Sequence, residues 1–191
     1  MLKDIVPSQA RRKILALFFQ NYGESYHLRR VCREVEQEIN AVKRELDILE
    51  NAKILIKEKR LNKSIYSINT KYLFFDELLR IFAKELTLSQ SIMKDKGRLG
   101  KVVFAAMSLK LMKKEVIKQS EVYLLFVGTV VAAEVQKIIQ SVEKDYPFEI
   151  NYTIMPKTEF DYRKKQNDPF MWTFLREPKV MLVGSESALM V

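Results

Sequence analysis

Two short segments in the first third of the chain carry residue types that bind polyanions. Residues 37–44 combine amides, a small residue and two cations, namely Gln37, Asn40, Ala41, Lys43 and Arg44. Residues 59–63 supply the polar side chains of Lys59, Arg60, Asn62 and Lys63. Lysine and arginine bind phosphate or guanine, and asparagine forms paired hydrogen bonds with adenine. The two segments therefore predict a surface that contacts phosphates and base edges.

Other arrangements that carry chemistry do not occur in the sequence. There is neither a glycine-rich phosphate loop nor a cluster of cysteine and histidine. His27 is the single histidine, and without a companion at ligand spacing we expect a strand residue rather than a metal ligand. The single cysteine, Cys32, cannot form an internal disulfide, which fits a reducing cytoplasm. We expect no metal and no cofactor.

Composition favours a globular protein with a basic N-terminal part. Residues 1–70 contain 14 Lys and Arg against 9 Asp and Glu, and the whole chain has a formal net charge of +9. This excess points to a polyanion, although a solvated basic surface without a partner has the same composition. The longest apolar runs, broken at Gly128 and Thr129, fall short of the roughly 20 residues that span a bilayer. With no secretory signal at the start, we expect a cytoplasmic protein.

Three helices are predicted to position the first segment. A helix over residues 37–52 has apolar residues three and four apart, which form one buried stripe: Ile39, Val42, Leu46, Leu49 and Ala52. This leaves the polar residues of the segment outside, although an ordinary amphipathic surface helix has the same pattern. Helices over 8–23 and 28–35 precede it. Arg11 and Arg12 oppose the dipole at the start of the first helix, so an external phosphate or plain solvation would explain them.

A predicted hairpin positions the second segment. Alternating residues in 53–60 and 64–68 flank a turn at Leu61, Asn62 and Lys63, which gives a basic tip. The order of helix, short strand, two helices and basic hairpin resembles the winged helix-turn-helix regulators, notably the ArsR-like group. INAVKRELDILENAKILIKEKRLNKSIYSIN is the most similar stretch. The resemblance implies that the third helix enters the major groove and the wing grips the neighbouring backbone.

The rest of the chain predicts a second, small α/β domain, so that the fold class is α+β. A helix from Tyr72 presents a bulky apolar face, and the polar segment from Ser89 to Gly100 is the expected linker. Strands at 102–107, 122–128, 148–155 and 179–183 alternate with helices at 132–143, 158–166 and 169–175. We expect a DNA-binding domain over 1–70, a linker helix over 71–100 and this domain over 101–191.

Residues 101–191 resemble the minimal nucleotidyltransferases of the DNA polymerase β superfamily that are fused behind a winged helix. The strand FAAMS ends at Ser108, twelve residues separate it from Glu121, and SEVYLLFVG begins the second strand; the tail segments EINYTIMPKTEF and DPFMWTFLREPKVMLVG are also similar. The family needs paired carboxylates that hold divalent metals. At the matching positions this chain has Glu121 and Tyr123, and Met107 replaces the glycine before Ser108, where we expect its side chain to obstruct phosphates. We therefore expect an inactive domain.

These observations predict a sequence-specific, DNA-binding transcriptional regulator that acts as a homodimer on double-stranded DNA. Its second domain would serve assembly, or bind an unknown ligand or protein partner. Two alternatives stay open. One is an active nucleotidyltransferase that modifies a protein or RNA, with Glu121 as a lone metal ligand. The other is an antitoxin-like protein-interaction module.

Overall fold

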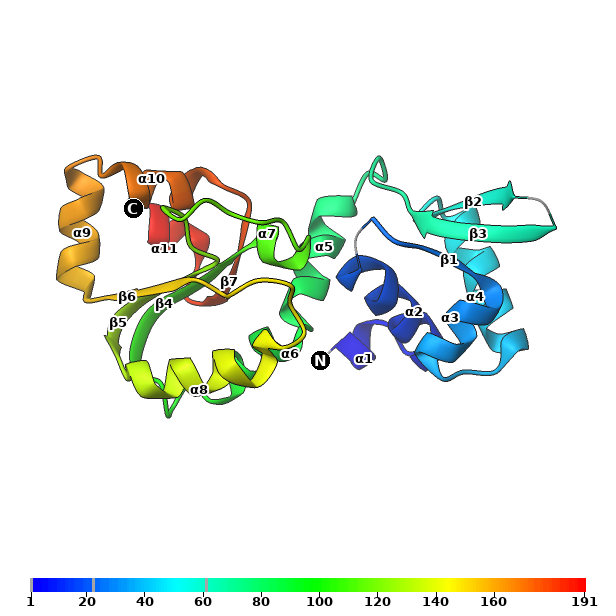
Figure 1. Cartoon of the computed structure of the whole chain (residues 1–191), viewed down its shortest axis with the longest axis horizontal. Helices are drawn as coiled ribbons and strands as arrows, with labels where there is room; N and C mark the ends of the chain where they lie inside the picture. Colours follow the sequence, from blue (N-terminus) through cyan, green and yellow to red (C-terminus); the bar gives the residue numbers. More distant parts are fainter. Residues whose placement is uncertain (1, 22, 61) are drawn as a thin grey trace. The chain divides into compact units, whose positions relative to one another are not determined.

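The computed structural model describes residues 2–21, 23–60 and 62–191, and the chain divides into two compact units, Met1–Phe82 and Ala83–Val191 (Figure 1). Each unit has its own sheet, with three strands in the first and four in the second. Helices and both sheets together make the fold α+β, as the sequence predicts.

The first unit contains helices, a short strand and a hairpin in the expected order. Its elements are α1 (Leu2–Ile5), α2 (Gln9–Gln20), β1 (Ser25–His27), α3 (Leu28–Val35), α4 (Ile39–Asn51), β2 (Leu55–Arg60), β3 (Lys63–Ile68) and most of α5 (Phe75–Lys84). β3 lies between β1 and β2 and is antiparallel to both. The helix α1 was not predicted, and the predicted turn residue Leu61 lies outside the described residues.

The buried stripe of α4 is confirmed in its middle and wrong at its ends. Val42 and Leu46 are wholly buried and Leu49 is 2 % exposed. Ile39 is instead 45 % exposed, and Ala52 is exposed as well. Both lie where the helix starts or stops, so the helices that pack against its middle do not cover them.

The first unit extends beyond its expected end at residue 70 because two residues of α5 pack on α2. The ring of Phe19 lies 5.9 Å from that of Phe75 and 5.0 Å from that of Phe82, in stacked orientation. The expected polar linker from Ser89 to Gly100 was wrong. A helix, α6 (Thr87–Lys94), begins before it and buries Leu88 and Ile92.

The second unit is a four-stranded sheet covered by helices. Its elements after α6 are β4 (Gly100–Ser108), α7 (Leu109–Met112), β5 (Leu124–Val130), α8 (Ala132–Glu143), β6 (Tyr152–Met155), α9 (Lys157–Lys165), α10 (Pro169–Arg176), β7 (Lys179–Val183) and α11 (Glu186–Met190). The strand order is β6-β5-β4-β7. Only the pair β5 and β6, which α8 connects, is parallel. Helices α7 and α11 were not predicted.

Alternate residues of the strands supply the two faces of this sheet. On one face Phe104 and Leu125 pack with residues of α9, α10 and α11, such as Phe160 and Phe174. On the other face α6 approaches the sheet, and Oγ of Ser89 lies 3.7 Å from Sδ of Met107. Figure 1 shows α8 and α9 on different sides of the sheet. Within the described part of the chain, no helix has both the length and the apolar character needed to cross a membrane.

Candidate nucleic-acid interface

A groove of about 850 Å³ lies between the first half of α4 and the β2–β3 hairpin, within the first unit. The residues that line it come from the start of α3 (His27, Leu28, Arg29), from α4 (Ile39, Lys43) and from the hairpin (Lys57, Asn62, Lys63, Ser64, Tyr66). The groove therefore lies between the two elements that the sequence predicts to contact a polyanion.

The charge of the groove is entirely positive. Four cations line it, Arg29, Lys43, Lys57 and Lys63, and none of its described lining residues is acidic. Nζ of Lys57 lies 3.5 Å from Oδ1 of Asp47. The other three cations form no ion pair with a described residue. A concave surface that concentrates positive charge attracts polyanions and raises their rate of association.

Only some of the residues predicted for α4 lie in this groove. Lys43 lines it, whereas Gln37 and Ala41 line a separate hollow of about 510 Å³ together with Glu36 and Glu38. Asn40 and Arg44 are exposed on α4 and line neither hollow. Because Glu36 and Glu38 are acidic, the hollow that they line is a poor site for an anion.

The hairpin directs its basic residues to two different faces. Successive residues of a strand point to opposite faces, so Lys59 shares the face of Lys57, and its cross-strand partner is Ser64 in the groove. Arg60 lies on the other face, opposite Lys63 of β3, and its Nη2 is 2.9 Å from Oε2 of Glu58, with which it forms an ion pair on its own strand. Asn62 and Lys63, which belong to the predicted basic tip, both line the groove.

Arg11 and Arg12 have internal partners in place of the expected external anion. Nε of Arg11 donates to Oε2 of Glu45 at 2.7 Å, and the Ser8 hydroxyl donates to Oε1 at 2.6 Å. Burial raises the pKa of Glu45, but these hydrogen bonds outweigh burial, so the pKa lies below its ordinary value. Nη1 of Arg12 donates to the carbonyls of Val6 and Pro7. Both arginines therefore fix the start of α2.

The sequence did not predict Arg29, Lys57 or His27 as part of the groove. Arg29 follows the first residue of α3, and the pairing of β1 with β3 brings that end of α3 to the hairpin. Nδ1 of His27 accepts a hydrogen bond from the backbone N–H of Arg30 at 3.2 Å and so caps α3. A local sequence pattern could not predict that these residues line the groove, because their positions depend on strand pairing.

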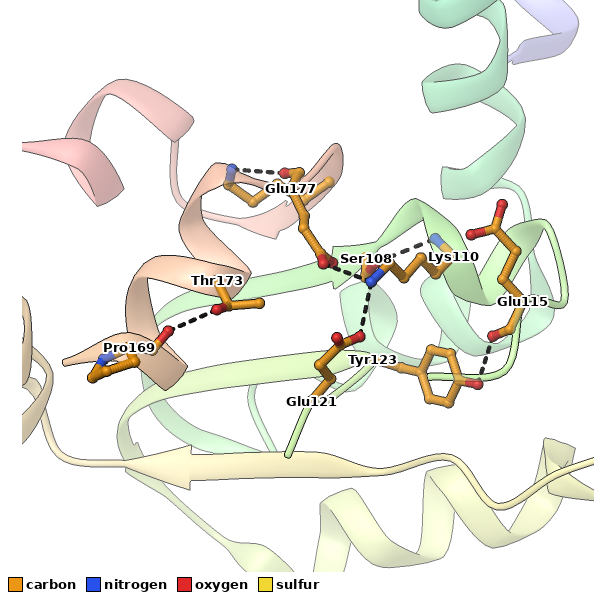
Figure 2. A network of polar contacts seen from close by, with 9 residues as sticks. Ser108, Lys110, Glu115, Glu121, Tyr123, Pro169, Thr173 and Glu177 are labelled. Atoms are coloured by element: carbon orange, nitrogen blue, oxygen red, sulfur yellow. Dashed lines mark hydrogen bonds and ion pairs between the residues drawn. The ribbon is translucent and has the colours of Figure 1, made fainter. Parts of the chain in front are cut away.

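A second polar cluster lies in the second unit, around Glu121, one of the positions on which the resemblance to nucleotidyltransferases is based (Figure 2). Nζ of Lys110 lies 2.8 Å from Oε2 of Glu121 and 2.5 Å from Oε1 of Glu177. The hydrogen bond from Lys110 lowers the pKa of Glu121, against the opposing effect of burial. Burial alone would lower the pKa of Lys110, but its bonds to the two carboxylates raise it. An ammonium group thus occupies the space between the two acids.

The other two positions of that resemblance, Tyr123 and Ser108, have structural roles. Tyr123 is 1 % exposed, its hydroxyl donates to the carbonyl of Glu115 at 2.8 Å, and its ring stacks on Phe148. Burial raises the pKa of its hydroxyl, so it stays protonated. Ser108 is 1 % exposed, and its hydroxyl accepts from the backbone N–H of Lys110 at 3.3 Å.

The side chain of Met107, which we expected to obstruct phosphates, is wholly buried in the core beside Ser89. The group that fills the polar cluster is the ammonium of Lys110.

No protein-family model, curated protein or solved structure matches the chain. A function therefore has to be inferred from the groove and the polar cluster.

A pair of divalent metal ions does not fit the polar cluster. Glu121 is already held by an ammonium group, and the buried phenol of Tyr123 is a poor ligand for a hard cation. Glu149 is exposed and shares a hollow of about 490 Å³ with Glu121. Among the residues that the structure describes, no three acidic, histidine or cysteine side chains are grouped as metal ligands.

Proposed function

We propose that the chain is a sequence-specific, DNA-binding transcriptional regulator whose first unit is a winged helix-turn-helix of the ArsR-like kind. The observation that carries this proposal is the groove between α4 and the hairpin. It is lined by four cationic residues, and none of its described lining residues is acidic. In this arrangement α4 enters the major groove, and the hairpin follows the adjacent phosphate backbone. Exposed Asn40, Lys43 and Arg44 on α4 supply base and phosphate contacts.

The second unit, in this proposal, is a nucleotidyltransferase-like domain that does not transfer nucleotides. Support comes from Lys110, whose ammonium group binds Glu121 and Glu177, and from the buried, protonated Tyr123. Incubation with Mg²⁺ and labelled nucleoside triphosphates should give no labelled product. Transfer that disappears in Glu121→Gln would establish the enzymatic alternative.

DNA binding is tested first by selecting bound duplexes from a random library and then by titrating the selected duplex at several salt concentrations. Lys43 and Lys63 are exposed, lie on opposite sides of the groove and have no ion-pair partner among the described residues. Each phosphate contact contributes a slope of about 0.9 to the dependence of log K on log salt. Lys43→Ala combined with Lys63→Ala should therefore flatten the slope by about 2.

Lys71→Ala is the matched control, because Lys71 is an exposed lysine of the same unit that does not line the groove. Its slope should equal that of the wild type. An unchanged slope in the double variant would refute the groove as the DNA site. Complete lack of duplex affinity in the wild type would favour the protein-interaction alternative.

We also propose that the regulator binds DNA as a homodimer, because two half-sites multiply affinity and specificity. The first unit exposes apolar residues that a second copy could cover, with Leu73 81 % and Phe74 54 % exposed. Sedimentation of the wild type and of Leu73→Ser with Phe74→Ser tests this surface, since the double variant should sediment as a monomer.

A further inference from the structure

Ile39 departs from the pattern of its helix. It is 45 % exposed at the first position of α4, although Val42 and Leu46 in the same stripe are wholly buried. A single exposed isoleucine on a protein surface is ordinary. This one, however, lines the cationic groove, so any molecule that fills the groove contacts it.

The position of Ile39 relative to Lys43 determines what that molecule must offer. The two residues are four apart, so they lie on one face of α4, one turn from each other, and both line the groove. A polyanion that approaches Lys43 therefore comes close to an apolar side chain. A phosphate gains nothing from that contact, because burying apolar surface is favourable only against another apolar group.

We propose that Ile39 contacts the C5-methyl group of a thymine, which makes it a specificity-determining residue. This inference rests on the proposed binding of duplex DNA. Thymine presents its methyl group in the major groove, where the other base edges present hydrogen-bond donors and acceptors. The helix α4 enters the major groove of the DNA with Ile39 in its first turn and Lys43 in the next. Ile39 therefore selects a thymine at one position of each half-site.

The test replaces single thymines by deoxyuridine, which keeps base pairing and removes only the methyl group. In the duplex selected from a random library, each thymine is replaced in turn and the affinity is measured by anisotropy. At one position of the half-site the wild type should bind the uracil duplex about fourfold more weakly, the effect of leaving one methyl group unburied. Ile39→Ala should bind the thymine and uracil duplexes equally at that position.

Ile48→Ala is the matched control. Ile48 lies on the same helix and is 41 % exposed, but it does not line the groove. This variant should retain the fourfold preference of the wild type. Thermal unfolding verifies that both variants fold, which their exposed positions favour.

Two results would overturn the role of Ile39 without affecting the proposed function. One is a wild type that binds duplex DNA with equal affinity for thymine and uracil at every position. The other is an Ile39→Ala variant that keeps the preference. A wild type that binds no duplex at all would instead overturn the proposed function, and the inference with it.

Discussion

The ammonium nitrogen of Lys110 lies 2.8 Å from Oε2 of Glu121 and 2.5 Å from Oε1 of Glu177. Lys110 follows the end of β4, Glu121 precedes β5, and Glu177 precedes β7. Because β4 lies between β5 and β7 and is antiparallel to both, the end of β4 lies beside the starts of β5 and β7, and these three residues meet there. One cation therefore connects three neighbouring strands (Figure 2).

Replacing this cation should destabilise the second unit in a way that depends on pH. We expect Lys110→Met to lower the free energy of unfolding by about 2 kcal/mol at pH 7, because two carboxylates lose their charged partner. The pKa of Glu121 is lowered in the fold, so its contribution is present above the ordinary value of 4.5 and is lost as the pH falls through the lowered value. The difference between wild type and variant should therefore shrink in acid.

Urea unfolding between pH 3 and pH 8 measures this difference. Lys101→Met, at an exposed lysine of β4, serves as the control and should differ little from the wild type at any pH. A loss of stability in Lys110→Met that does not change with pH would mean that packing, and not the ion pairs, is responsible.

The two basic neighbours at the end of β2 should differ in DNA binding. Lys59 shares a hairpin face with Lys57 and Ser64 of the groove, whereas Arg60 does not line the groove and its guanidinium forms an ion pair with Glu58. Lys59→Ala should therefore flatten the salt dependence of duplex binding by about 1, and Arg60→Ala should leave it unchanged. Anisotropy titrations at several salt concentrations distinguish them, and equal slopes in the two variants would show that the ion pair with Glu58 does not keep Arg60 from the DNA.

Much of the secondary structure could be predicted because apolar residues repeat with the period of each element. The predicted bounds of α3, α8 and β7 agree with the structure. Helix α6 was missed because its segment is mostly polar and only Leu88 and Ile92, four residues apart, mark its buried face. The short helices α7 and α11 offer even less periodicity, so local pattern could not reveal them.

The composition of the groove could be predicted only in part. Lys43, Asn62 and Lys63 were predicted, because basic and amide residues on a helix and at a hairpin tip are visible in the sequence. Arg11 was assigned to phosphate because its partner Glu45, 34 residues away, belongs to a different helix. Glu45 lies on the buried face of α4, three residues after Val42 and four before Leu49, so the spacing indicates its burial but not which residue becomes its partner.

Arg11 should matter for stability and not for DNA. Glu45 is 6 % exposed, so Arg11→Met leaves a buried carboxylate with Ser8 as its remaining side-chain partner. We expect the free energy of unfolding to fall by about 2 kcal/mol at pH 7. The pKa of Glu45 is lowered in the fold, so this loss is full above 4.5 and declines as the pH falls below it.

Arg33→Met, at an arginine whose side chain is 76 % exposed, should change stability by less than about 0.5 kcal/mol. Thermal unfolding measures both variants, and anisotropy should show the wild-type salt slope for Arg11→Met at a temperature where it is folded. A flattened slope would instead place Arg11 on a phosphate.

Gly128 should be indispensable to the pairing of β4 with β5. Its φ is +138°, and a Cβ atom there would lie 2.2 Å from the carbonyl oxygen of Lys101, beside an irregularity of β4 between Val102 and Phe104. Gly128→Ala should lower the free energy of unfolding by about 3 kcal/mol, since the backbone of β4 must move. At Gly97 a Cβ atom would meet nothing within 4 Å, so Gly97→Ala should stay within about 0.5 kcal/mol of the wild type. Urea unfolding compares the two, and similar stabilities would show that β4 can shift at Lys101 without losing its pairing.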